Sequence, residues 1–145
     1  MENRFEIFTV LINRINRNIH KIKKNEMMGY KLNAVHISCL YYLYVLDGLT
    51  ATDLCEKCEE DKATISRAIE FLETNGYLVC EIKTGKRYKT PFKLTERGIS
   101  TGEKIFEKVN KVLDDVSIGL TNDERKAFYR YLSIISDNLD AIAGK

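Results

Sequence analysis

Proline and long apolar runs are scarce in this chain, and both absences narrow its class. It has one proline among 145 residues, of which 44% are hydrophobic and 30% charged. That composition is typical of a folded, largely helical protein and excludes a disordered or fibrous one. No window approaches the roughly 18 uninterrupted apolar residues of a membrane helix, and Arg and Lys interrupt the N-terminal apolar run. We therefore expect a single cytoplasmic domain with no signal peptide and no membrane span.

The sequence also lacks the motifs of common enzyme classes. It contains no nucleophile motif, no glycine-rich loop that cradles phosphate and no paired sets of metal ligands. Its candidate acids and bases fall on the polar faces of expected helices. We predict that the chain is not an enzyme and that it has no cofactor and no metal site.

The cysteines and histidines follow no complete ligand pattern. Four cysteines without a secretory signal indicate reduced thiols rather than a disulfide framework. Cys55 and Cys58 have the spacing of a metal-binding pair, but a second pair is missing and Cys39 and Cys80 are isolated. Three interpretations of the cysteines stay open: they are structural or inert thiols, they form a thiol sensor, or Cys55 and Cys58 bind a metal. His20 and His36 have no obvious third ligand, which favours ordinary surface or core residues.

Apolar residues at three- and four-residue steps predict six helices. The expected helices cover residues 2–24, 34–47, 51–60, 62–75, 96–119 and 122–142. Polar residues suited to helix N-caps precede five of them. These caps are Asn33, Thr50 with Asp53, Asp61, Thr95, and Thr121 with Glu124.

Between the fourth and fifth helices the pattern changes to that of a β-hairpin. YLVCEI (77–82) and PFKLT (91–95) have the composition of strands, and KTGKRYKT (83–90) between them is a polar turn. Gly76 is expected to end the fourth helix in the left-handed conformation. The predicted fold is mainly α: a helix-turn-helix with a small hairpin, flanked by long helices at both ends.

Charge is distributed unevenly, although the net charge is only +2. From Lys62 to Arg97 there are eight basic and four acidic residues, and six of the basic residues lie in or just after the hairpin. Cations beside a helix-turn-helix suit a DNA duplex, because they release counterions from phosphates while a helix enters the major groove. The hairpin would then be a wing whose tip, Lys86 and Arg87, reaches an adjacent minor groove.

Two segments, LTATDLCEKCEEDKATISRAIEFLETNGYL and GKRYKTPFKLTERG, resemble the MarR family of winged helix-turn-helix transcriptional regulators. The shared features are a short helix, an acidic cap, Thr/Ser-Arg on the recognition helix, a Leu-Glu-x-x-Gly stop and a wing ending in Leu-Thr-x-x-Gly. The flanking helices match in length and order, so the resemblance covers essentially the whole chain. It implies a homodimer on a pseudo-palindromic operator, with residues 1–30 and 98–145 as dimerisation helices and residues 32–97 as the DNA-binding region.

The wing departs from the family pattern at one position. Family members commonly carry Asp-x-Arg at the wing tip, whereas this chain has Gly85-Lys86-Arg87. Arg87 matches the arginine, but the aspartate that steadies it is missing. Either the arginine is less ordered here, or Lys86 and Lys89 share the phosphate contacts.

The expected DNA contacts lie at the start of the fourth helix and on the wing. They are Lys62, Ala63, Thr64, Ser66, Arg67, Lys86, Arg87 and Lys89. Hydroxyl and guanidinium groups suit base edges and phosphates, lysines suit the phosphate backbone, and the alanine methyl suits a thymine methyl. The alternative is that these residues are the solvated face of an amphipathic helix and an ordinary turn.

His36, Tyr41 and Tyr44 are candidates for a pocket that binds a small aromatic or phenolic effector, by resemblance to other members of the family; plain core packing is the alternative. We therefore predict a ligand-responsive repressor that binds double-stranded DNA as a homodimer. The alternative function is a winged-helix module that binds a protein and has no specific DNA site.

Overall fold

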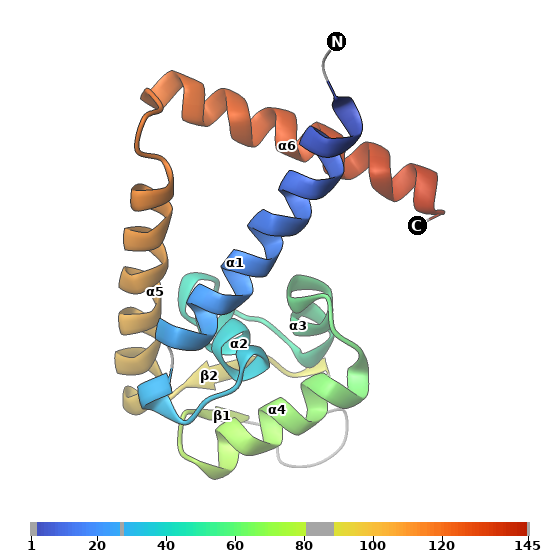
Figure 1. Ribbon diagram of the computed structural model, residues 1–145. Coiled ribbons are helices and arrows are strands. Elements are labelled where there is room, and N and C mark those ends of the chain that lie inside the picture. Colours follow the sequence, from blue (N-terminus) through green and yellow to red (C-terminus); the bar gives the residue numbers. More distant parts are fainter. Residues whose placement is uncertain (1–2, 27, 81–88, 145) are drawn as a thin grey trace. The chain divides into compact units, whose positions relative to one another are not determined.

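The computed structural model describes residues 3–26, 28–80 and 89–144 (Figure 1). They divide into two compact units, Met1–Lys108 and Val109–Lys145, with the boundary inside one long helix. In chain order the elements are η1 (Glu6–Val10), α1 (Leu11–Glu26), η2 (Met28–Tyr30), α2 (Ala34–Val45), α3 (Ala51–Cys58), α4 (Lys62–Thr74), β1 (Leu78–Cys80), β2 (Phe92–Leu94), α5 (Glu96–Val116) and α6 (Asn122–Ala143). The predicted fold class, a mainly α winged helix-turn-helix with long terminal helices, is confirmed.

Helix ends differ from the predicted ones for local reasons. The first predicted helix begins as a π-helical segment, η1, before α1 continues to Glu26. Helix α2 ends two residues early, because Leu46 adopts an extended conformation with φ −128° and ψ 138°. Helix α3 ends at Cys58, because Glu59 adopts the left-handed conformation with φ 53° and ψ 46°. The helix-turn-helix therefore contains a tight turn at Glu59 that the apolar spacing did not predict.

The predicted N-caps are confirmed by side-chain hydrogen bonds to the first turns of the helices. The cap oxygens of Asn33, Thr50, Asp61 and Thr121 accept N–H groups three residues on, at 2.9, 3.2, 2.7 and 3.1 Å. His36 completes a capping box with Asn33, because its Nδ1 accepts the Asn33 N–H at 3.1 Å. Each cap satisfies backbone donors that the helix itself leaves unpaired, and so fixes where the helix begins.

Strands β1 and β2 form an antiparallel pair that covers one side of the core. Leu78 lies opposite Leu94, Val79 opposite Lys93, and Cys80 opposite Phe92. Side chains alternate between faces, so Leu78 and Phe92 are buried while Val79 is exposed. The predicted hairpin is confirmed in these strands; its turn, residues 81–88, lies outside the described residues.

The core of the unit Met1–Lys108 lies where α2, α3 and α4 meet the two strands (Figure 1). Its largest fully buried side chains are Leu40, Leu54, Ile65, Leu72, Leu78, Ile105 and Cys39. They come from α2, α3, α4, β1 and the middle of α5. Burying about seven such side chains holds α4 rigidly, and this fixes the direction of its outer face.

Two glycines allow α5 to approach its neighbours closely. A Cβ at Gly98 would overlap the backbone carbonyl of Tyr77, and a Cβ at Gly102 would lie 2.8 Å from Cβ of Tyr44. Thr95 caps this helix as predicted, because its Oγ1 accepts the N–H of Gly98 at 3.1 Å. The start of α5 is therefore fixed against the end of α4 and against α2.

Candidate nucleic-acid interface

Helix α4 buries one face and exposes the other. Ile65, Ala68, Ile69 and Leu72 are buried. The exposed face at the beginning of the helix carries Lys62, Ala63, Ser66 and Arg67. Residues at these three- and four-residue steps are neighbours on a helix surface. Four of the five α4 residues predicted to contact DNA therefore form one exposed surface, and the fifth, Thr64, is half-buried at its edge.

Hydrogen bonds orient the groups on this surface. Asp61 accepts the N–H of Thr64 at 2.7 Å, and Arg67 Nη2 donates to Thr64 Oγ1 at 3.3 Å. The backbone hydrogen bond from Thr64 holds the pKa of the Asp61 carboxyl below its ordinary value. These hydrogen bonds link Asp61, Thr64 and Arg67, and they hold the guanidinium group of Arg67 above the first turns of α4. In helix-turn-helix proteins this part of the recognition helix contacts base edges.

The charge of α4 changes sign along its length. Lys62 and Arg67 are in the first half, whereas Glu70 and Glu73 are in the second half. A phosphate backbone is attracted to the first half and repelled by the second. This asymmetry favours an approach in which the N-terminal half of α4 lies nearest to the duplex.

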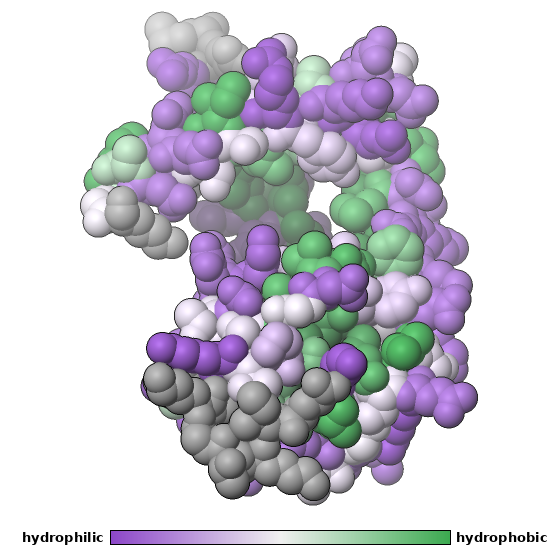
Figure 2. Space-filling view, turned by 180° about the vertical axis from the view of Figure 1, so that it is seen from behind, coloured by the Kyte–Doolittle hydropathy of each residue, from purple (hydrophilic) through white to green (hydrophobic). Residues whose placement is uncertain are grey.

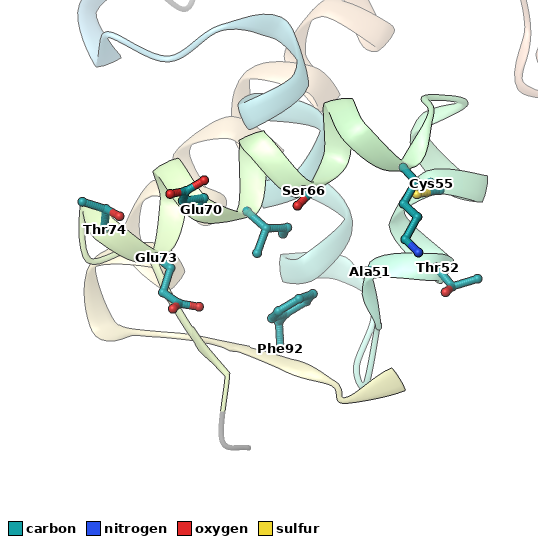
Figure 3. Close-up of a pocket in the computed structure, with 10 residues that line it drawn as sticks. Ala51, Thr52, Cys55, Ser66, Glu70, Glu73, Thr74 and Phe92 are labelled. Atoms are coloured by element: carbon teal, nitrogen blue, oxygen red, sulfur yellow. The ribbon is translucent and has the colours of Figure 1, made fainter. Parts of the chain in front are cut away.

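A groove of about 820 Å³ borders this surface between α3, α4 and β2 (Figure 3). Ser66 lines it from α4, Thr52 and Cys55 line it from α3, and Phe92 lies at its base from β2. Thr52 is exposed and was not among the predicted contacts. The sequence signal for a contact at Thr52 is the position of this residue, one residue after the start of the first helix of the helix-turn-helix.

The predicted wing contacts are only partly described. Lys89 is exposed, just before β2. Lys86 and Arg87 lie outside the described residues. Lys93, at the middle of β2, is exposed on the outer side of the sheet. The described part of the wing therefore adds basic side chains to the same unit as α4.

The residues predicted for an effector pocket fall into two aromatic clusters. The His36 ring stacks on Phe71 of α4, with centroids 4.1 Å apart and planes 8° apart. Tyr41 and Tyr44 instead contact Phe106 of α5, at centroid distances of 6.4 and 5.7 Å. The three residues are therefore not brought together around one aromatic centre. The effector pocket remains a prediction.

The cysteines lie on three elements. Cys39 of α2 and Cys80 of β1 are buried, whereas Cys55 and Cys58 of α3 are half-buried. All four cysteines are free thiols. Within residues 3–26, 28–80 and 89–144, no three His, Cys, Asp or Glu side chains gather in a way that would hold a metal ion. The helices in these ranges also include none that is long and apolar enough to cross a membrane.

A family comparison defines the class of protein. Residues 35–116 match the family of winged helix DNA-binding domains, which is more than half of the chain. The chain therefore belongs to that family. No curated protein sequence matches it at a significant level.

A comparison with solved structures shows which winged-helix proteins the chain is similar to. A MarR-family transcriptional regulator from Silicibacter pomeroyi is 25% identical, with a TM-score of 0.76 over 88% of this chain and 86% of that one. MepR of S. aureus, in complex with DNA, is 19% identical, with a TM-score of 0.78 over 91% and 97%. BpsR of Bordetella bronchiseptica, whose DNA binding is regulated by 6-hydroxynicotinic acid, is 23% identical, with a TM-score of 0.74 over 94% and 98%. The sequence-based assignment to MarR-type transcriptional regulators is confirmed.

Proposed function

We propose that this transcriptional regulator is a ligand-responsive repressor that occupies a pseudo-palindromic operator as a homodimer. The observation that supports it most directly is the exposed surface at the start of α4. Lys62, Ser66 and Arg67 lie together there, and Arg67 is oriented by Thr64. These side chains are the types that contact phosphates and base edges in the major groove.

Each residue of the α4 surface has a role that follows from its chemistry. Arg67 donates to a guanine edge or to a phosphate, and Ser66 hydrogen-bonds to a base or phosphate nearby. Lys62 contacts the backbone at the helix start, and Ala63 contacts a thymine methyl group. Lys89, with Lys86 and Arg87, makes the contacts of the wing.

The proposed homodimer is supported by apolar side chains that the single chain leaves at its surface. Helix α1 and the segment before it expose Phe5, Phe8, Ile12, Ile15, Ile19 and Ile22, and no residue of η1 is buried. Helix α6 likewise buries none of its residues and exposes Phe128, Leu132, Leu139 and Ile142. Figure 2 shows apolar side chains, in green, at the surface of the chain. Contiguous exposed apolar faces mark interaction sites, so we assign dimerisation to the regions 1–30 and 98–145.

Two-fold symmetry sets the form of the operator. A dimer with two equivalent α4 helices presents them to two half-sites of opposite orientation. Helix-turn-helix dimers place such half-sites about one helical turn apart, roughly 34–36 Å. The operator is therefore expected to be an inverted repeat with that spacing.

A small aromatic effector would act by shifting the population of dimer conformations. BpsR is regulated by 6-hydroxynicotinic acid, an aromatic acid, and this chain has Tyr41, Tyr44 and Phe106 clustered between α2 and α5. In one dimer conformation the spacing of the two α4 helices matches the half-sites of the operator, and in another it does not. A ligand that binds the second conformation more tightly lowers operator affinity, by an amount set by the ratio of its affinities for the two conformations. The effector is proposed to be a planar aromatic acid or phenol.

Fluorescence anisotropy tests the proposal. The protein is titrated onto duplex from upstream of its own gene and onto a random duplex of equal length, at about 50 and 200 mM salt, with wild type, a Ser66→Ala, Arg67→Ala double variant, and Lys104→Ala. We expect the wild type to prefer the upstream duplex, and the double variant to lose about 10-fold or more of that preference. Lys104 is exposed on α5, so its loss changes charge without removing a proposed base contact.

The same titration distinguishes the alternative function. A winged-helix module that binds protein would bind both duplexes equally weakly, with little change between the two salt concentrations. That result would remove the repressor proposal.

A further inference from the structure

An acidic side chain, Glu70, lies on the outward face of α4 among the residues proposed to contact DNA. The opposite face of the helix is buried and carries Ile65, Ala68, Ile69 and Leu72. Glu70 is exposed, and it follows Ser66 by four residues and Arg67 by three. Residues at these steps are neighbours on a helix surface. Ser66 and Glu70 also line the same groove between α3, α4 and β2 (Figure 3).

The position of Glu70 along α4 is close to the middle of the helix. The 13 residues of α4 span about 20 Å, whereas the major groove of DNA is about 12 Å wide. In the proposed complex, the ends of the helix therefore lie near phosphates and the middle of its outward face lies over base edges. Lys62 is at one end, and Arg67 and Glu70 are on either side of the midpoint. Glu70 is thus placed over bases rather than beside a phosphate.

Helix stability does not explain an acidic residue at this position. The residue three positions on is Glu73, and like charges at neighbouring positions of a helix are unfavourable. The cation three positions before, Arg67, hydrogen-bonds in the other direction along the helix, to Thr64 Oγ1 at 3.3 Å. The first turn of α4, where the helix dipole favours negative charge, has no acidic residue. An exposed residue that opposes the local preferences of its helix indicates a functional role.

A carboxylate above base edges discriminates between the four bases. It only accepts hydrogen bonds, so it needs a donor. Cytosine presents its N4 amino group in the major groove, whereas guanine presents two acceptors and thymine presents one. Adenine presents an amino group beside the acceptor N7, which repels a carboxylate. Cytosine is therefore the base that suits Glu70 best.

We propose that Glu70 is a specificity-determining residue that accepts a hydrogen bond from the N4 amino group of a cytosine in each half-site of the operator. This inference rests on the proposed function and adds a base preference to it. Arg67 and Glu70 are separated by about 4.5 Å along the helix axis, and successive base pairs by about 3.4 Å. The cytosine is therefore expected about one base pair from the base that Arg67 faces. Basic residues supply affinity for any duplex, whereas Glu70 lowers the affinity for duplexes without this cytosine.

Two substitutions change the hydrogen bonding at position 70 and keep the helix. Glutamate, glutamine and alanine are all good helix formers, and the position is exposed, so circular dichroism should show the wild-type fold in both variants. Glutamine has nearly the size of glutamate but carries a donor as well as an acceptor, which suits N7 and N6 of adenine. Glu70→Gln should therefore change the preferred base from cytosine to adenine. Glu70→Ala should bind duplexes with any of the four bases about equally.

Selection from a randomised duplex pool, followed by anisotropy, tests these expectations. Wild type and each variant select duplexes, the bound fraction is sequenced, and anisotropy then compares four duplexes that differ only at the affected base pair. We expect wild type to prefer cytosine by about 10-fold over guanine and thymine. Glu73→Gln is the matched control, because it removes the same charge from a half-buried residue of the same helix, and it should keep the cytosine preference.

The outcomes separate this inference from the proposed function. A selected motif in which one base changes only in the Glu70 variants, from cytosine to adenine in Glu70→Gln, supports the inference. The same motif in wild type and both Glu70 variants would overturn the role of Glu70, and the repressor proposal would stand. An equal change in Glu73→Gln would also overturn that role, since charge alone would explain the effect. If wild type selects no motif at all, the repressor proposal fails and the inference fails with it.

Discussion

Gly98 at the start of α5 lies directly against the backbone carbonyl of Tyr77, so closely that a Cβ at residue 98 would overlap the carbonyl oxygen. Neighbouring hydrogen bonds stabilise the same junction between the start of α5 and residues 75–77. Thr95 Oγ1 donates to the Gly76 carbonyl, and Arg97 donates to the Asn75 carbonyl at 2.8 Å and to the Tyr77 hydroxyl at 3.1 Å. The Leu-Thr-x-x-Gly motif thus has a structural reason: it joins the end of the wing to the end of the recognition helix.

Replacing Gly98 with alanine should destabilise the fold strongly. The Cβ meets backbone rather than the end of a flexible side chain, so the junction between α5 and β1 must move. Overpacking of this kind typically costs about 1–3 kcal/mol. Urea denaturation followed by circular dichroism should show a lower midpoint. Gly29→Ala is the control, because nothing lies within 4 Å of its Cβ position, and it should change stability by less than about 0.5 kcal/mol. Equal midpoints for the two variants would contradict the close approach.

Local chemistry explains which features the sequence predicted. The caps at Asn33, Thr50, Asp61 and Thr121 depend only on residues three positions apart, so sequence spacing defines them. The left-handed stop at Gly76, with φ 78°, has the same local origin. The exposed surface of α4 follows from helical periodicity once its buried residues are recognised.

Contacts between distant residues were not predictable in the same way. Contacts between two helices depend on the angle at which the helices pack, and periodicity within either helix contains no information about that angle. The stacking of His36 on Phe71 joins residues of α2 and α4. His36, Tyr41 and Tyr44 were grouped by resemblance to effector-binding members of the family, whereas the packing of α2 gives them different partners.

The buried His36 should make stability depend on pH. Its side chain is only 8% exposed, burial lowers its pKa, and its Nδ1 accepts the Asn33 N–H. The unfolded chain, with a histidine pKa of about 6.5, therefore takes up a proton more readily than the folded one. The free energy of unfolding should be constant above about pH 6.5 and should decrease as pH falls from there through the lowered folded pKa. Urea titrations at pH 7.5, 6.5 and 5.5 measure this.

A matched pair of variants isolates the contribution of His36 to that pH dependence. His36→Gln should be less stable at pH 7.5, since the stack on Phe71 is lost, and its stability should vary less between pH 6.5 and 5.5. His20→Gln changes an exposed histidine of α1 and should keep the wild-type pH dependence. An unchanged slope in His36→Gln would show that other groups cause it. The capping aspartates Asp53 and Asp61, whose pKa values are lowered by hydrogen bonds from Thr50 and Thr64, should titrate in a separate, more acidic range.

The apolar face of α1 should decide the oligomeric state. Ile12 and Ile19 are 40% and 56% exposed in the single chain, and both belong to one stripe along the helix. Charges on a buried dimer interface are strongly unfavourable unless paired. An Ile12→Lys, Ile19→Lys variant should elute with a mass near the 16.8 kDa of one chain, and wild type near twice that, in light scattering coupled to size exclusion. Asn13→Lys, on the opposite face, should behave like wild type; wild type eluting as a monomer would remove the dimer proposal.

Lys62 should contribute affinity without sequence preference. It is exposed at the first position of α4, where the helix dipole and its own charge both attract a phosphate. Removing one phosphate contact lowers the salt slope of log K by about 1 and weakens binding to every duplex alike. Lys62→Ala should therefore bind upstream and random duplexes more weakly by the same factor, whereas Arg67→Ala should weaken binding mainly to the upstream duplex. Anisotropy at several salt concentrations distinguishes them. A loss of sequence preference in Lys62→Ala would instead place its ammonium group on a base edge, and the assignment of roles along α4 would have to be exchanged.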